Sequence, residues 1–248
     1  MAKAIITGSG FESASFGEVI AEHRPELSLG QASSVVLELE NNASTTESFF
    51  WLRRHGESGG IAPHSINYRA NIYALHKLGV TEIISVNTVG GISARCGAGS
   101  FVVPDQIIDC TWGRQHTFFD GEFLPLKHID FTFPFSNSQR DVLIASAAKL
   151  DINLVDSGTC VCTQGPRLET AAEIRAYAIQ GADIVGMTVM PEAALARELD
   201  IEYASLCPVV NPAAGLSDEV LNEAAIRERA LGMLDTSVAL IKHALVDS

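Results

Sequence analysis

The chain has 248 residues and a formal net charge of −13, with 30 acidic against 17 basic residues. A chain of this length forms one large domain or two small ones, and it can bury roughly 70–75% of its unfolded surface without a disulfide or metal. The hydrophobic share of 47% is that of a globular protein. The acidity argues against nucleic acid or an acidic membrane as a partner, but a local cluster of donors can still hold a small anion.

The five cysteines are scattered, and most of them lie in apolar runs, which is typical of reduced core thiols. Strand alternation puts Cys160 and Cys162 on one face, but no second cysteine or histidine pair lies nearby, so no metal site is expected. The apolar run at the N-terminus is too short for a signal peptide, and no stretch reaches the ~20 apolar residues of a membrane span. We therefore expect a reduced, cytoplasmic protein without membrane contact.

Short apolar runs alternate with helical patterns along the chain. In chain order the pattern predicts strands at 4–7, 35–39 and 49–52, a helix at 66–78, strands at 82–86 and 101–110, a helix at 141–150, a strand at 154–162, a helix at 171–179, a strand at 183–185, a helix at 192–199, a strand at 203–210 and one long amphipathic helix at 219–245. This alternation predicts an α/β fold, a single domain over residues 1–248, with a mixed, largely parallel β-sheet flanked by helices.

Polar and glycine-rich segments follow the predicted strands. They read GSG, RRHG, NTVGG, TQGPRLE and GMT, and Asn211 stands where the strand at 203–210 runs out. Ligands of such sheets lie beyond the carboxyl ends of the strands. Asn-Pro dipeptides also start turns, so a plain turn is the alternative for Asn211. The convergence of so many strand ends favours a ligand-binding role.

The first three of these segments have chemistry suited to a phosphate. The turn at Ser9 lacks the third glycine of a dinucleotide fingerprint, but it can offer backbone N–H groups and a hydroxyl to one phosphate, a plain tight turn being the alternative. Arg54 supplies a bidentate fork for phosphate and His55 a further donor, although such a pair is also common on solvated surfaces. Thr88 offers an amide and a hydroxyl beside two glycines that allow a close backbone approach.

The later segments suit the sugar and the base of a ligand. Thr188 can bond a phosphate, while Met187 gives soft packing under a sugar or base, or simply belongs to the core. Glu169 stands at a helix start, where an acidic residue stabilises the helix dipole, or it accepts a proton-bearing nitrogen of a ligand. The sequence contains no HExxH pair and no GxSxG elbow, so neither metal-dependent hydrolysis nor a covalent nucleophile is supported.

Taken together, the segments TGSG, RRHG followed by APHSINYRANIYALHKLG, VNTVGGI, GPRLETAAEIR and GADIVGMTVMPEAALARE are specific in order and spacing. With them the chain resembles the trimeric purine nucleoside phosphorylase family, and most closely its methylthioadenosine and methylthioinosine phosphorylase branch, over residues 8–211. The resemblance implies phosphorolysis, in which phosphate attacks C1′ of a purine nucleoside and the base leaves. It also implies a homotrimer, with phosphate as co-substrate and no metal or organic cofactor.

The matching motifs assign each site residue a role. Phosphate would be held by Ser9, Arg54, His55, Asn87, Thr88 and Thr188, the ribose would pack on Met187, and the purine would meet Glu169 and Asn211. In this family, adenine-specific members carry aspartate at the position of Asn211, whereas members acting on 6-oxopurines carry this Asn and this Glu. The chemistry agrees, because Glu169 can accept the N1–H of hypoxanthine, whereas adenine presents a lone pair there.

The 5′ end of the sugar decides between close relatives. Purine nucleoside phosphorylases of this family usually place a His after the base-reading Asn to hold a 5′-hydroxyl, and here none occurs between residues 129 and 242. An apolar lining, for which Val220, Leu221 and Ile226 are candidates, would suit a methylthio group. His128 resembles a His that methylthioadenosine phosphorylases place near the 5′ group of a neighbouring subunit.

The sequence therefore favours cleavage of S-methyl-5′-thioinosine to hypoxanthine and 5-methylthioribose 1-phosphate, a purine salvage reaction. A general 6-oxopurine nucleoside phosphorylase is the first alternative, and a methylthioadenosine phosphorylase is weakened by Gly59 and Ala213, which replace residues of the adenine branch. An alternative from another class is a non-catalytic nucleoside-binding module on the same fold, although such a module need not keep a phosphate-binding set.

Overall fold

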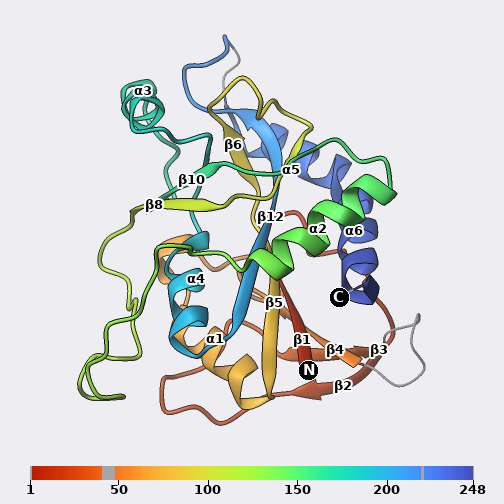
Figure 1. Cartoon of the computed structure of the whole chain (residues 1–248), viewed down its shortest axis with the longest axis vertical. Helices are drawn as coiled ribbons and strands as arrows, with labels where there is room; N and C mark the ends of the chain where they lie inside the picture. The colour runs from red at the N-terminus through yellow and green to blue at the C-terminus, as the bar shows by residue number, and fades with distance from the viewer. Residues whose placement is uncertain (1, 41–47, 219–220, 248) are drawn as a thin grey trace.

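The computed structural model describes residues 2–40, 48–218 and 221–247. Figure 1 shows a twisted sheet through the middle of the molecule with helices on both sides, which confirms the predicted α/β class. The strands are β1 (Ala2–Thr7), β2 (Val19–His23), β3 (Val36–Glu40), β4 (Ser48–Arg53), β5 (Val80–Val86), β6 (Val89–Gly91), β7 (Phe101–Val102), β8 (Gln106–Cys110), β9 (Leu154–Val155), β10 (Thr159–Thr163), β11 (Ile184–Gly186) and β12 (Glu202–Pro212). The α-helices are α1 (Tyr68–Lys77), α2 (Asn137–Lys149), α3 (Ala171–Ile179), α4 (Val189–Glu198), α5 (Glu223–Gly232) and α6 (Leu234–Asp247).

The sheet is mixed and largely parallel, as predicted. Its strand order is β2-β3-β4-β1-β5-β12-β6-β11-β10-β8, with β7 and β9 attached beside β12. Strands β4, β1, β5 and β12 run parallel, and so do β11, β10 and β8. Antiparallel pairs occur at the β2-β3-β4 edge, between β6 and β11, and between β7 and β12. The parallel register brings the carboxyl ends of strands distant in sequence to one edge.

Strand β12 joins the two halves of the sheet. Its first part pairs with β5, from Glu202 opposite Glu82 to Leu206 opposite Val86. Its second part pairs with β6, where Asn211 stands opposite Gly90. At 11 residues it is long enough to serve both halves. Asn211 therefore reaches beyond the end of β5, over the glycines that follow Asn87.

Side-chain alternation along β1 shows how the two faces of the sheet are covered. Ala4 and Ile6 belong to one buried cluster, with apolar residues of α1 and α4, whereas Ile5 belongs to another, with residues of α2 and α6. Successive side chains of a strand point to opposite faces, so these helix pairs lie on opposite sides of the sheet (Figure 1). A third, smaller cluster packs α3 against β10 and β11.

Local signals set the ends of several helices. The Asn67 side chain accepts the N–H of Ala70 at 3.0 Å at the start of α1, and Gly79 follows this helix with a φ of +79°. Helix α3 begins with a capping box in which Thr170 and Glu173 bond each other's backbone N–H groups. Among the described residues, no helix is long and apolar enough to cross a membrane.

The predicted single helix at 219–245 is wrong, because α5 and α6 are separated at Met233, and residues 219–220 lie outside the described part of the chain. Gly232 weakens helix continuation at this point. The predicted strands at 101–110 and 154–162 are each divided into two, with Pro104 and Gly158 in the interruptions. Strand β2 was not predicted. Its apolar Val19 and Ile20 are about half exposed, at 47% and 54%, so they do not form the buried face by which a strand is recognised.

A glycine in the centre of the sheet tests this packing. A Cβ on Gly91 in β6 would lie 1.9 Å from the carbonyl oxygen of Cys96, whereas a Cβ on Gly97 would meet nothing within 4 Å. We expect Gly91→Ala to lower the free energy of unfolding by about 1–3 kcal/mol or more. Gly97→Ala is the matched control, and urea unfolding of both variants checks the prediction. Equal stability of the two would contradict it.

Candidate active site

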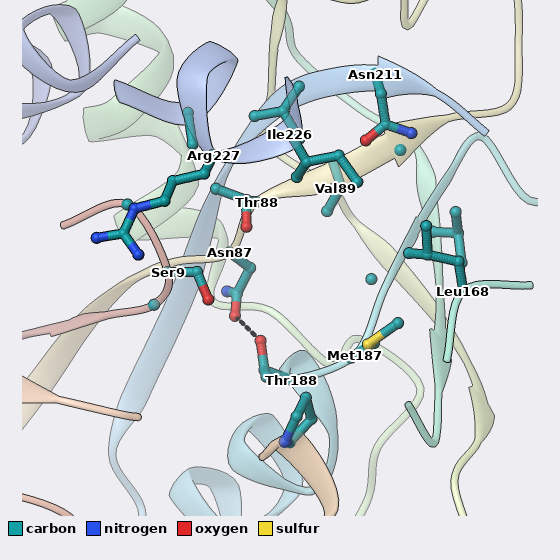
Figure 2. Close-up of a pocket in the computed structure, with 18 of the residues that line it drawn as sticks. Ser9, Asn87, Thr88, Val89, Leu168, Met187, Thr188, Asn211, Ile226 and Arg227 are labelled. Carbon is teal, nitrogen blue, oxygen red and sulfur yellow. Dashed lines mark hydrogen bonds between the residues drawn. The ribbon is translucent and has the colours of Figure 1, made fainter. Parts of the chain in front are cut away.

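A cavity of about 250 Å³ lies at the carboxyl ends of the parallel strands. The predicted site residues that line it are Ser9, His55, Asn87, Thr88, Glu169, Met187, Thr188 and Asn211. In Figure 2, Ser9, Thr88 and Thr188 gather on one side, Asn211 and Leu168 lie on the other, and Met187 lies at the bottom between them. The structure therefore joins segments that are up to about 200 residues apart into one site, with two exceptions described below.

The polar side of the cavity has a supporting network behind it. Asn87 Nδ2 donates to the hydroxyls of Ser85 and Ser205, each at 2.7 Å, and Asn87 Oδ1 accepts the hydroxyl of Thr188 at 2.7 Å. The backbone N–H of Asn87 donates to the carbonyl of Leu206 at 3.1 Å. The N–H groups of Asn87 thus bind other protein groups, and its side-chain oxygen fixes the position of Thr188.

Arg54 is one of the predicted site residues that does not line the cavity. Its side chain is fully buried, with Nε and Nη2 each 2.7 Å from a carboxylate oxygen of Glu192 in α4, and Nη1 donating to the carbonyl of Val86 at 3.0 Å. Tyr203 also donates to Glu192, at 2.8 Å. A Cβ on Gly8 would lie 3.0 Å from Nη1, so the guanidinium lies directly behind the glycine turn.

His55 follows Arg54 and does line the cavity. Its Nδ1 lies 2.7 Å from the carbonyl oxygen of Ile61, which can only accept, so Nδ1 carries the proton. Burial lowers the pKa of His55, and the positive charge of Arg54 lowers it further, against a raising effect of the Ile61 carbonyl. The imidazole is therefore neutral at pH 7, with Nε2 as its second polar atom.

The lining of the cavity also includes a carboxylate, that of Glu169, and a carboxamide, that of Asn211. Glu169 Oε1 accepts the hydroxyl of Thr163 at 2.6 Å, which fixes the carboxylate at the end of β10. Asn211 Nδ2 donates to the carbonyl of Pro212 at 2.7 Å. A Cβ on Gly90 would lie 3.3 Å from this nitrogen, a tight contact, so the glycine eases the close approach of the carboxamide to β6. Together these groups present an acceptor and an amide to a planar heterocycle.

Helix α5 closes a further part of the cavity, and sequence reasoning identified it only in part. Leu221 and Ile226 were candidates and do line it, whereas Val220 lies outside the described residues. Glu12, Gly59, Pro63, Leu168, Glu223, Arg227 and Ala230 also line it and were not predicted as ligand contacts. Arg227 lies 3.8 Å from Glu12, whose Oε1 accepts the N–H of Gly10 at 3.3 Å. The spacing of apolar residues in α5 indicated a helix. Nothing in the neighbouring sequence indicated that this helix packs over the glycine turn.

His128 is the second exception, because it is exposed and does not line the cavity. It belongs to the segment 111–136 between β8 and α2, which is free of helices and strands. Three large apolar side chains of this segment are exposed, namely Trp112 at 72%, Leu126 at 74% and Phe133 at 63%. In a single chain this segment therefore leaves an apolar surface open to solvent.

The prediction that the side chains of Cys160 and Cys162 lie on one face of their strand is confirmed, since both belong to the same buried cluster. Burial raises the pKa of Cys162 to about 12 and that of Cys160 well above its usual value, so both are thiols at neutral pH. Among the described residues, no group of three or more His, Cys, Asp or Glu side chains is arranged to hold a metal ion.

Comparison with known proteins gives consistent matches. Residues 4–245 match the phosphorylase superfamily. The chain is 52% identical over 178 residues to a probable S-methyl-5′-thioinosine phosphorylase of Pseudomonas syringae pv. tomato, covering 72% of each chain. It is 47% identical over 204 residues to a 6-oxopurine nucleoside phosphorylase of Pyrococcus furiosus, covering 80% of this chain and 77% of the other. Methylthioadenosine phosphorylase from Schistosoma mansoni in complex with adenine superposes with a TM-score of 0.94 at 29% identity, covering 99% of this chain and 91% of that one.

The buried Arg54–Glu192 pair offers a stability test. Glu192→Gln keeps the shape but leaves the guanidinium without its counter-charge, and removing one partner of a buried pair costs about 3–5 kcal/mol. We expect a loss of this size in urea unfolding. The matched control is Glu57→Gln, which removes the charge from the exposed Arg24–Glu57 pair and should change stability little. An equal, small effect of both substitutions would contradict the prediction.

Proposed function

The chain belongs to the phosphorylase superfamily, and we propose that it is a purine nucleoside phosphorylase whose preferred substrate is S-methyl-5′-thioinosine. Phosphate attacks C1′, the bond from C1′ to N9 of the purine breaks, and the products are hypoxanthine and 5-methylthioribose 1-phosphate. The observation that carries this proposal is that Glu169 and Asn211 line a single cavity together with a set of hydroxyl and imidazole groups. Figure 2 shows Asn211 across this cavity from Ser9, Thr88 and Thr188. Inorganic phosphate is the co-substrate.

Phosphate binds, in this proposal, on the side formed by Ser9, His55, Thr88 and Thr188. Hydroxyl and backbone N–H groups donate to its oxygens. His55 was expected to be a further donor, but its proton lies on Nδ1, so Nε2 accepts a hydrogen bond from a protonated phosphate oxygen instead. Asn87 acts by holding Thr188, since its own donors bind Ser85, Ser205 and Leu206. Arg54 contributes from behind the Gly8 turn, where two of its N–H groups remain beyond those that bind Glu192 and Val86.

The purine binds between Glu169 and Asn211. The Glu169 carboxylate accepts N1–H of hypoxanthine. As the base leaves, N7 takes a proton from water, and Asn211, whose Nδ2 binds the Pro212 carbonyl, accepts the new N7–H through Oδ1. As the glycosidic bond breaks, its electrons move into the purine. Hydrogen bonds to the departing base stabilise that charge, and the bound phosphate stabilises the cationic sugar packed on Met187. Adenine would place a lone pair against the carboxylate.

The lining contributed by α5 and the residue Leu221 before it supports the methylthio choice, because Leu221, Ile226 and Ala230 add apolar surface to the cavity. One observation favours the second candidate, a general 6-oxopurine nucleoside phosphorylase. Glu12 and Arg227 line the same end of the cavity, and they offer polar partners to a 5′-hydroxyl. The P. syringae and P. furiosus relatives carry names that correspond to these two candidates.

We further propose that the active form is a homotrimer in the cytoplasm. The exposed Trp112, Leu126 and Phe133 would be covered by a neighbouring subunit, which would also bring its His128 towards the 5′ group of the substrate. The resemblance to trimeric phosphorylases is the source of this assembly, and the open apolar segment is consistent with it. The reaction serves purine salvage, since it returns a free base and a sugar phosphate.

Product analysis tests the function directly. We expect base release only with phosphate present, with kcat/KM highest for S-methyl-5′-thioinosine, then inosine, then methylthioadenosine. The mispaired carboxylate should disfavour the 6-amino base roughly 10- to 150-fold. Base release without phosphate would indicate a hydrolase, and no release at all would indicate a binding module. A preference for inosine would contradict the 5′ assignment, and one for methylthioadenosine would contradict the assignment of the base.

Substitution at position 211 tests the base contact separately. Asn211→Asp replaces the amide by a carboxylate, which can accept from a 6-amino group, so the ratio of kcat/KM for methylthioadenosine to that for methylthioinosine should rise about tenfold. Asn153→Asp is the matched control, since Asn153 is exposed and lies outside the cavity. An unchanged ratio in the Asn211 variant would show that this residue does not read the base.

A further inference from the structure

The side chain of Arg114 makes an extensive set of hydrogen bonds, although the residue lies in an irregular segment. It lies in the segment 111–136, which has no helix or strand, yet its side chain is buried, with 8% of its surface exposed. Its guanidinium lies 5.4 Å from the ring centroid of Tyr68. The oxygens within hydrogen-bond distance of it are all neutral, and they belong to Tyr68, Thr163, Gln164, Met187 and Met190. A buried guanidinium held in this way fixes the positions of the backbone carbonyl groups that it binds.

One side of the fork holds the segment that carries the ribose platform. Nη1 donates to the carbonyl of Met187 at 2.9 Å and to that of Met190 at 2.6 Å, and these two carbonyls flank Thr188. Nη1 also lies 3.2 Å from the hydroxyl of Tyr68, which itself donates to the carbonyl of Pro63 at 3.0 Å. Pro63 and Met187 both line the cavity.

The other side of the fork holds the segment that leads to the base-binding carboxylate. Nη2 donates to the carbonyls of Thr163 at 3.2 Å and Gln164 at 2.8 Å, and Nε lies 3.2 Å from the Gln164 side-chain oxygen. Thr163 is the residue whose hydroxyl holds Glu169 at 2.6 Å. One planar group therefore sets the spacing between the Met187 backbone and the start of the Glu169 loop.

We propose that Arg114 is a positioning residue that sets the distance between the ribose platform at Met187 and the base-binding carboxylate of Glu169. The inference rests on the proposed function, because it concerns how the same cavity holds a nucleoside. Arg114 itself does not line the cavity and contacts no reacting atom. It acts through two peptide segments whose carbonyl groups it holds in fixed directions, which a flexible ammonium cannot reproduce.

The phosphate side does not depend on Arg114 to the same degree. Ser9, His55 and Thr88 follow β1, β4 and β5, and none of them is a hydrogen-bond partner of the guanidinium. Thr188 is held separately through Asn87. A positioning role therefore predicts a change in the nucleoside parameters with little change in the phosphate parameters, whereas simple loss of folded protein would lower kcat alone.

The test compares Arg114→Met with Arg140→Met. Arg140 also binds two backbone carbonyls, those of Pro104 and Asp156, but away from the cavity. In Arg114→Met, kcat/KM for methylthioinosine should fall about 100-fold, mostly through KM, since misplacement by about 1 Å costs this much. KM for phosphate should stay within about threefold of wild type. Arg140→Met should leave both KM values unchanged.

Arg114→Lys decides the question if the Met variant does not fold. It keeps the charge but loses the planar fork, so its nucleoside KM should rise about tenfold, with melting temperature recorded alongside. An unchanged nucleoside KM in the folded Lys or Met variant would overturn the proposal, and so would an equal KM increase in Arg140→Met.

Titration with hypoxanthine separates this proposal from the proposed function. If wild-type protein releases no base with phosphate, the function fails, and calorimetric binding of hypoxanthine then decides the role of Arg114. We expect about 10- to 100-fold weaker hypoxanthine binding in Arg114→Met than in wild type or Arg140→Met. Equal binding by the variant, or no binding by wild type, would overturn the positioning role.

Discussion

The site depends on the way in which β12 pairs with two other strands at once. Its lower part is held by β5, where Ser205 comes to lie under Asn87, and its upper part is held by β6, which brings Asn211 beside Gly90. The same strand therefore fixes the support of Thr188 on one side of the cavity and the base-binding amide on the other. A change of register in this strand by one residue would turn both side chains to the opposite face.

Charge is distributed unevenly around the cavity. The one fully buried guanidinium described here, that of Arg54, is neutralised by Glu192, and the pKa of His55 is lowered by burial and by that guanidinium. The phosphate side is thus formed mainly by neutral hydroxyl and amide donors, beside the unprotonated Nε2 of His55. Such donors bind an anion by dipoles fixed in place, which suits a co-substrate that must leave as part of the product. The carboxylates of Glu12, Glu169 and Glu223 also line the cavity, and Glu12 lies at the glycine turn, where it accepts the N–H of Gly10.

Much of this could be predicted from sequence, because strand ends and helix stops are local signals. The α/β class, the family and the meeting of Ser9, His55, Thr88, Met187 and Asn211 in one cavity were predicted and are found. Partners across the fold were not, since nothing near Arg114 in the sequence indicates that it binds carbonyls 49 to 76 residues away. The same holds for Glu192, whose burial against Arg54 spans 138 positions.

The central place of β12 has a consequence for how the chain acquires its structure. Strands β5 and β6 are made more than 100 residues before β12, yet in the finished sheet β12 lies between them. During synthesis both strands therefore wait with unpaired edges until nearly the whole polypeptide has emerged, and such edges attract other chains. Shielding of the half-made sheet would limit such association, and the binding cavity is complete only once β12 has paired with both strands.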